Sequence, residues 1–96
     1  MDEKRMERVG RQLERFMGKI ASGELKDMPI AERGVLYTLI GFSAEDNVIG
    51  VTEQILPETV ETVRKHLKWL VDRGYVEFRP EDAGRQISKR HYVVHI

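Results

Sequence analysis

The hydrophobic period of the chain changes at a single glycine near its C-terminal end. Across residues 57–73 apolar side chains recur every three or four positions, which predicts an amphipathic helix with the inward stripe Val60, Val63, Leu67, Leu70 and Val71. Gly74 is placed to end this helix in the left-handed conformation. The alternating segments 75–79 and 87–95 follow, and the turn-rich stretch 80–86 between them predicts a hairpin.

A second amphipathic pattern covers residues 2–21 and predicts an N-terminal helix that ends at Ser22-Gly23. Its apolar stripe consists of Met6, Val9, Leu13, Phe16, Met17 and Ile20. The charged residues between these positions form a solvated face, on which Glu7 and Arg11 have the spacing of an ion pair. This helix could pack on its own domain or on the same helix of a second copy.

A further helix is predicted to begin near Asp27 or Met28, with Asp27 as N-cap and Pro29 in the first turn. It extends to Gly41 and presents an apolar face of Ile30, Val35, Leu36, Leu39 and Ile40. Residues 48–56 fit either a short strand followed by a short helix or one helix interrupted by Gly50. The order of elements predicts an α+β fold that is mainly α.

Length and composition narrow the class of protein. A chain of 96 residues is expected to form one domain. The absence of cysteine excludes disulfides and thiolate metal sites. No apolar run approaches the ~18 residues that a membrane span needs, and the start of the chain is charged, so we expect a cytoplasmic protein that does not bind membranes.

No cofactor, metal or catalytic site is predicted. The chain has no nucleophile beside a base, no paired carboxylates and no glycine-rich phosphate loop, so the sequence predicts that it is not an enzyme. His91 and His95 are four residues apart on a predicted strand, about 13 Å, which is too far to share one ion. The remaining histidine, His66, has no partner at helical spacing.

The net charge of zero hides an uneven distribution. Residues 57–96 carry eight basic and six acidic side chains, whereas residues 28–56 carry one basic and four acidic ones. The C-terminal part is therefore the positive pole, and local potential matters more for a charged partner than the total.

Residues 28–94 resemble the winged helix-turn-helix superfamily, particularly its MarR-like and ArsR-like branches. The resemblance is carried by MPIAERGVLYTLI, by ETVETVRKHLKWLVDRGYVEF and by GRQISKRHYVV, and most specifically by Thr62-Val63, Leu67, Leu70, Gly74 and Val76. It implies a three-helix core with a C-terminal β-hairpin wing (28–96), to which residues 1–27 add an amphipathic helix and linker. It also implies a transcriptional regulator that binds double-stranded DNA, and itself, as a homodimer.

In such proteins the start of the recognition helix meets base edges and its neighbours contact phosphates. The resemblance assigns base contacts to Thr59, Thr62 and Lys65, phosphate contacts to Arg64 and Lys68, and contacts from the wing to Arg79, Arg85, Lys89 and Arg90. Dimerisation is assigned to the N-terminal stripe, that is Met6, Val9, Leu13, Phe16, Met17 and Ile20, together with Trp69. Trp69 lies opposite the apolar stripe of its helix, so we expect the N-terminal helix or a partner subunit to cover it.

The alternative is a winged helix used as a protein-interaction or assembly module in replication or transcription machinery. The near-neutral charge favours it, as do Glu58 and Glu61 on the helix that would enter the groove, because carboxylates near phosphates are repelled.

Overall fold

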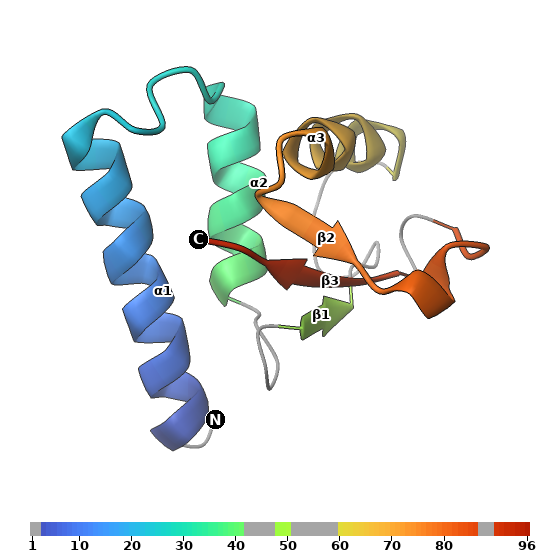
Figure 1. The fold of residues 1–96 in the computed structure, drawn as a ribbon, viewed down its shortest axis with the longest axis horizontal. Coiled ribbons are helices and arrows are strands. Elements are labelled where there is room, and N and C mark those ends of the chain that lie inside the picture. The colour runs from blue at the N-terminus through green and yellow to red at the C-terminus, as the bar shows by residue number, and fades with distance from the viewer. Residues whose placement is uncertain (1–2, 42–47, 51–59, 87–89) are drawn as a thin grey trace.

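The computed structural model describes residues 3–41, 48–50, 60–86 and 90–96. Its helices are α1 (Glu3–Ser22), α2 (Ile30–Gly41) and α3 (Val60–Asp72), and its strands are β1 (Val48–Gly50), β2 (Val76–Phe78) and β3 (His91–Val94) (Figure 1). One turn of 3₁₀ helix, Pro80–Asp82, follows β2. In this part of the chain the strands form one antiparallel sheet in the order β1-β3-β2. The protein is a small, mainly helical α+β domain, as its hydrophobic periods predict.

Two helices end where the sequence places a glycine. Gly23 follows α1 with φ 84°, and Gly74 follows α3 with φ 78°, a conformation that costs a side chain-bearing residue energy. At the end of α3 the amide of Gly74 donates to the carbonyl of Val71 (3.0 Å), and the amide of Tyr75 donates to the carbonyl of Leu70 (3.0 Å). These two bonds make a Schellman motif, which turns the chain directly into β2.

The predicted hairpin is present, with shorter strands than the alternation indicates. In the register, Val76 pairs with Val94 and Phe78 with Tyr92. The inner face of the sheet contributes the buried side chains of Val76, Tyr92 and Val94. Of the ambiguous segment 48–56, residues 48–50 form a strand that pairs with β3. Residues 51–56 lie outside the described part, as do residues 57–59, with which the long helix was predicted to begin.

A single hydrophobic core joins every described helix to the sheet. Its buried members are Phe16 from α1, Leu25 and Met28 from the connection, Val35, Leu36, Leu39 and Ile40 from α2, Val63, Leu67 and Leu70 from α3, and Val76, Tyr92 and Val94 from the sheet. Helix α1 lies along α2 (Figure 1). The predicted segment 1–27 therefore shares its core with segment 28–96. No helix in the described ranges is both long enough and apolar enough to cross a membrane.

The prediction that Ile30 belongs to the core is wrong. Ile30, assigned to the apolar face of α2, is 84% exposed. At 100° per residue, Leu36 and Leu39 mark the centre of the apolar stripe. Glu32 lies at this centre, whereas Ile30 lies on the opposite side of the helix. Glu32, not Ile30, takes the inward position and is only 6% exposed.

Candidate nucleic-acid interface

The outer face of α3 carries four of the nine residues that the sequence assigned to DNA. Docking of Val63, Leu67 and Leu70 in the core leaves Glu61, Thr62, Arg64, Lys65 and Lys68 exposed. The charge of Lys68 is balanced locally, because its Nζ lies 2.8 Å from Oδ2 of Asp72. Thr59, assigned to a base contact, lies outside the described residues.

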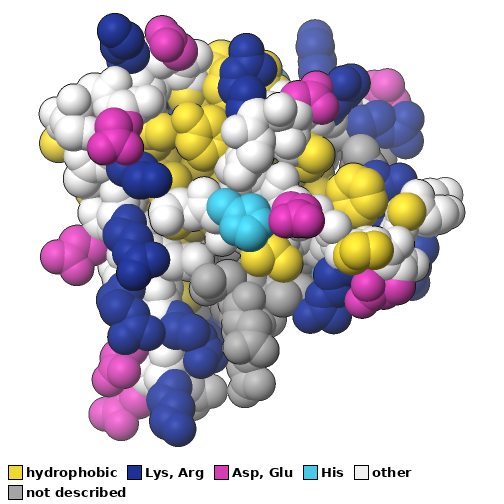
Figure 2. Space-filling model, viewed as in Figure 1, with side chains coloured by type: hydrophobic (Ala, Val, Ile, Leu, Met, Phe, Trp, Pro, Cys, Tyr) yellow, Lys and Arg dark blue, Asp and Glu magenta, His cyan; other side chains and the backbone are white. Residues whose placement is uncertain are grey.

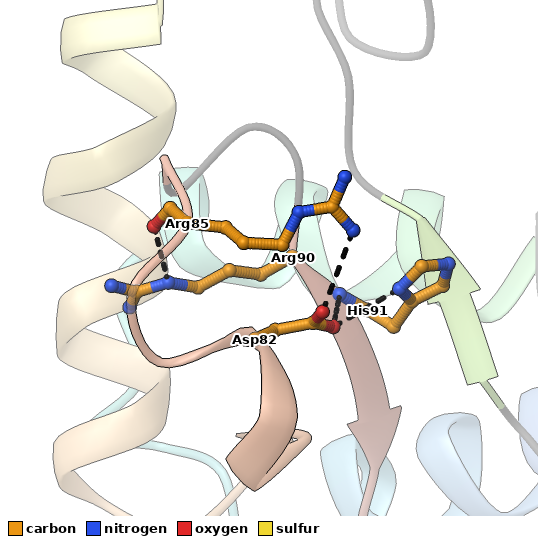
Figure 3. Close-up of polar contacts among 4 residues, drawn as sticks. All are labelled: Asp82, Arg85, Arg90 and His91. Carbon is orange, nitrogen blue, oxygen red and sulfur yellow. Dashed lines mark hydrogen bonds and ion pairs between the residues drawn. The ribbon is translucent and has the colours of Figure 1, made fainter.

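The hairpin loop is built around one buried carboxylate (Figure 3). Asp82 is 4% exposed, and its Oδ2 accepts a hydrogen bond from the His91 amide (2.8 Å) and lies 3.0 Å from Nδ1 of the same residue. Oδ1 is 3.6 Å from Nη1 of Arg85. The hydrogen bond from the His91 backbone is the main reason that the pKa of Asp82 is lowered; burial opposes it, and the His91 ring and Arg85 add to it. This carboxylate joins the loop to the start of β3.

Arg90 holds the other side of the loop. Its Nε donates to the carbonyl of Arg85 (3.0 Å), its Nη2 donates to the carbonyl of Ala83 (2.9 Å), and its guanidinium lies 4.5 Å above the ring of Phe78. These contacts give Arg90 a structural role in the loop, and they occupy the guanidinium to which the sequence assigned a DNA contact. Arg79 and Arg85 are exposed, and Lys89 lies outside the described residues.

A hollow of about 300 Å³ separates α3 from the hairpin. Its floor is apolar and its rim carries cations from both elements; it is lined by Arg64, Leu67, Lys68, Val71, Asp72, Phe78, Arg90 and Tyr92. Burial raises the pKa of Tyr92 to about 12, against the opposing effect of the Arg90 charge, so its hydroxyl is neutral at physiological pH. The fold thus brings Arg64, Lys68 and Arg90 to the lining of one hollow.

A polar contact that the sequence did not predict positions α3 on α2. Nδ1 of His66 lies 2.7 Å from Oε1 of Glu32, whose side chain is 8% exposed. The other two histidines also have a carboxylate neighbour. His91 is beside Asp82, and His95 Nε2 lies 2.9 Å from Glu77 Oε2. The signal that could have identified Glu32 was its place at the centre of the helical wheel of α2.

Trp69 is partly buried and has two ring contacts within its own chain. Its ring is stacked parallel to that of Tyr75, with centroids 6.3 Å apart and an angle of 2°, and the guanidinium of Arg73 lies 4.0 Å from its centroid. Tyr75 is the residue whose amide closes the Schellman motif, a position that often contacts the last turn of the helix. Trp69 is therefore explained as part of the end of α3.

The N-terminal stripe is divided between the core and the surface. Phe16 is buried, and Val9, Leu13 and Ile20 pack partly buried against the core of the same chain. Met6 and Met17 are each 58% exposed. Docking on its own domain, the alternative to dimerisation, thus accounts for most of the stripe. Dimerisation stays a prediction; of the six residues of the stripe, Met6 and Met17 are the exposed ones.

Comparison of the chain with protein-family models, with curated proteins and with solved structures found no match.

Proposed function

We propose that the chain is a winged helix-turn-helix protein that binds double-stranded DNA, with α3 in the major groove and the β2–β3 hairpin as the wing. The observation that carries this proposal is the placing of exposed cations on two adjoining elements. Arg64 and Lys65 on α3, and Arg79 and Arg85 beside the hairpin loop, are all exposed, while the apolar stripe of α3 is fixed in the core. A helix held in this way presents side chains that fit the width of the major groove.

The contacts are proposed residue by residue. Thr62 and Lys65 read base edges, Arg64 and Lys68 contact phosphates, and Arg79 and Arg85 reach the backbone or the minor groove from the wing. Arg90 is left out, because its guanidinium is already bound to the carbonyls of Ala83 and Arg85. As a homodimer the protein would bind a near-palindromic site, because two-fold symmetry repeats the half-site. The regulation of transcription is the role that this binding would serve.

Titration of a fluorescent random-sequence duplex by anisotropy, at two salt concentrations, tests the proposal. Each phosphate contact should steepen the fall of log affinity with log salt by about 0.9. The variant Lys65→Ala/Arg85→Ala should bind at least tenfold more weakly, with a slope shallower by about 1 from the lost backbone contact of Arg85. Both side chains are exposed, and Arg85 adds only a 3.6 Å contact to Asp82, so we expect the thermal midpoint to fall by no more than a few degrees.

Lys26→Ala is the control, because it removes an exposed cation from the connection between α1 and α2. Unchanged duplex affinity in the double variant would contradict the assignment of α3 and the hairpin. If the double variant does bind more weakly, selection from random duplexes would identify the DNA sequence that the protein prefers. Light scattering would give the number of subunits.

A second candidate function is a protein-interaction module. It is favoured by the carboxylates among the exposed residues of α3, since Glu61 is exposed and Asp72 neutralises Lys68. This function predicts no duplex binding, or binding without a salt slope, in the same titration.

A further inference from the structure

The charged face of α1 is separated by sign into two stripes. At 100° per residue, the cations Lys4, Arg8, Arg11, Arg15 and Lys19 fall within 80° of one another, at spacings of four, three, four and four. The anions Glu3, Glu7 and Glu14 fall within 40° of one another on the adjoining side. Figure 2 shows the cations as a dark-blue column along α1. We call the five cations the α1 basic stripe; they extend for about 22 Å along the helix.

No ion pair between described residues includes a cation of the stripe. The ion pairs between described residues join His66 to Glu32, Lys68 to Asp72, Arg85 and His91 to Asp82, and His95 to Glu77. The Glu7–Arg11 pair that the spacing favours is not among them. The stripe is therefore a line of charge available to a polyanion.

The centre of the stripe is hollowed and incompletely hydrogen-bonded. Arg8, Arg11, Gln12 and Arg15 line a hollow of about 340 Å³. Two of these residues also have a buried polar atom without a hydrogen-bond partner within the described chain, namely Nε of Arg8 and Oε1 of Gln12, and Gln12 is only 5% exposed. Leaving such groups unsatisfied is costly. An anionic oxygen in the hollow would accept from the guanidinium groups of the exposed Arg11 and Arg15.

We propose that the α1 basic stripe binds the phosphate backbone of a nucleic acid without reading its sequence. A backbone strand repeats one negative charge every 3.4 Å or so along the duplex axis, which suits a straight line of cations. Guanidinium groups supply three of the five, and their planar forks bind phosphate oxygens in pairs.

A lipid bilayer fits the same stripe less well. A helix that lies on a membrane inserts its apolar face beneath its charged one. The apolar face of α1 is already in use, because Phe16 is buried and Val9, Leu13 and Ile20 pack against the core.

This surface is separate from the one in the proposed function. Helix α2 lies between α1 and α3 and packs against both (Figure 1). The stripe therefore makes its own contribution to nucleic-acid affinity, and each surface can be tested while the other is intact.

The test is the triple variant Arg8→Gln/Arg11→Gln/Arg15→Gln, titrated with a random-sequence duplex between about 50 and 200 mM salt. We expect affinity to fall about tenfold or more, and the salt slope to become shallower by about 2–3, because each lost phosphate contact removes about 0.9. Glutamine keeps the helix propensity close to that of arginine. The matched control is Glu3→Gln/Glu7→Gln/Glu14→Gln, which removes three charges from the same helix and should bind at least as tightly as the wild type.

Arg8 is partly buried, so Arg11→Gln/Arg15→Gln is the second variant; both of its positions are exposed and its slope should decrease by about 2. An unchanged slope in a folded variant would overturn the proposal. So would a variant that loses binding to vesicles of 30% phosphatidylserine while its duplex binding is intact. If Lys65→Ala/Arg85→Ala binds the duplex normally and the α1 variants do not, the proposal for the α1 basic stripe holds and the proposed function is wrong. If the α1 variants bind normally and Lys65→Ala/Arg85→Ala does not, the proposed function holds and the proposal for the stripe is wrong.

Discussion

At the scale of single residues, Asp82 organises the hairpin loop through several donors at once. Its carboxylate accepts a hydrogen bond from the His91 amide, and it lies close to the ring of His91 and to the guanidinium of Arg85. A carboxylate that accepts hydrogen bonds in the folded state is favoured in its charged form, which is why its pKa is lowered. The loop that exposes Arg79 and Arg85 is thus held by a buried charge behind it.

Asp82→Asn removes that charge and should lower the urea midpoint of unfolding near neutral pH. A carboxyl with a lower pKa in the folded state stabilises the fold above its unfolded value, about 3.9, and loses this contribution as pH falls through the folded-state pKa. The difference between wild type and variant should therefore be largest at neutral pH and decrease below about pH 4. Urea unfolding across this range measures it, and a difference independent of pH would show that the charge is not responsible.

At the scale of elements, the ends of helices determine how the candidate interface is presented. The Schellman motif after α3 turns the chain into β2, and it also brings Tyr75 onto Trp69. The contact of His66 with Glu32 fixes the same helix on α2. The motif and this distant contact therefore add to the burial of Val63, Leu67 and Leu70, which turns the polar side of α3 outward.

Glycine-to-alanine substitutions at two positions should have opposite effects on stability. Gly74 has φ 78°, and Gly10 lies inside α1; an added methyl group would meet nothing within 4 Å at either position. Gly74→Ala should cost about 1–2 kcal/mol because of its left-handed backbone. Gly10→Ala should gain up to about 1 kcal/mol because alanine favours helices. Denaturant unfolding measures both, and a loss at Gly10 would mean that α1 is not a regular helix there.

At the scale of the whole molecule, α1 is part of the domain and not an appendage to it. Phe16 is 2% exposed in a core that also contains residues of α2, α3 and the sheet. A domain of this size has a small margin of stability, so one helix that contributes to the core matters to the whole fold.

Phe16→Ala should lower the free energy of unfolding by about 3–5 kcal/mol, as do other large-to-small changes in cores. Because Phe16 packs within its own chain, the loss should be the same at every protein concentration. Met6→Gln/Met17→Gln changes only exposed positions of the same stripe, so it should affect self-association, measured by light scattering, and leave unfolding nearly unchanged. A destabilisation by Phe16→Ala that disappears at high concentration would instead place this residue in a dimer interface.

The sequence predicted the elements better than their contacts. The period of α1 and α3, and the glycines at 23 and 74, locate these helices to within a residue or two where the structure describes them. The exposed positions of Arg64, Lys65 and Lys68 followed from the same period. The period was misapplied at Ile30, and the inward Glu32 was missed because a carboxylate is not expected inside without its partner.

What the amino-acid order determined alone is local: which residues are helical, where each helix ends, and which side of it is apolar. These properties depend on neighbours three or four positions away. Only the tertiary structure decided that α1 packs on α2 of its own chain, that β1 joins β3, and that His66 meets Glu32. Burial of an apolar stripe is favourable against any apolar surface, because the hydrophobic effect is not directional. The surface that the stripe contacts is therefore determined by the packing of the whole chain.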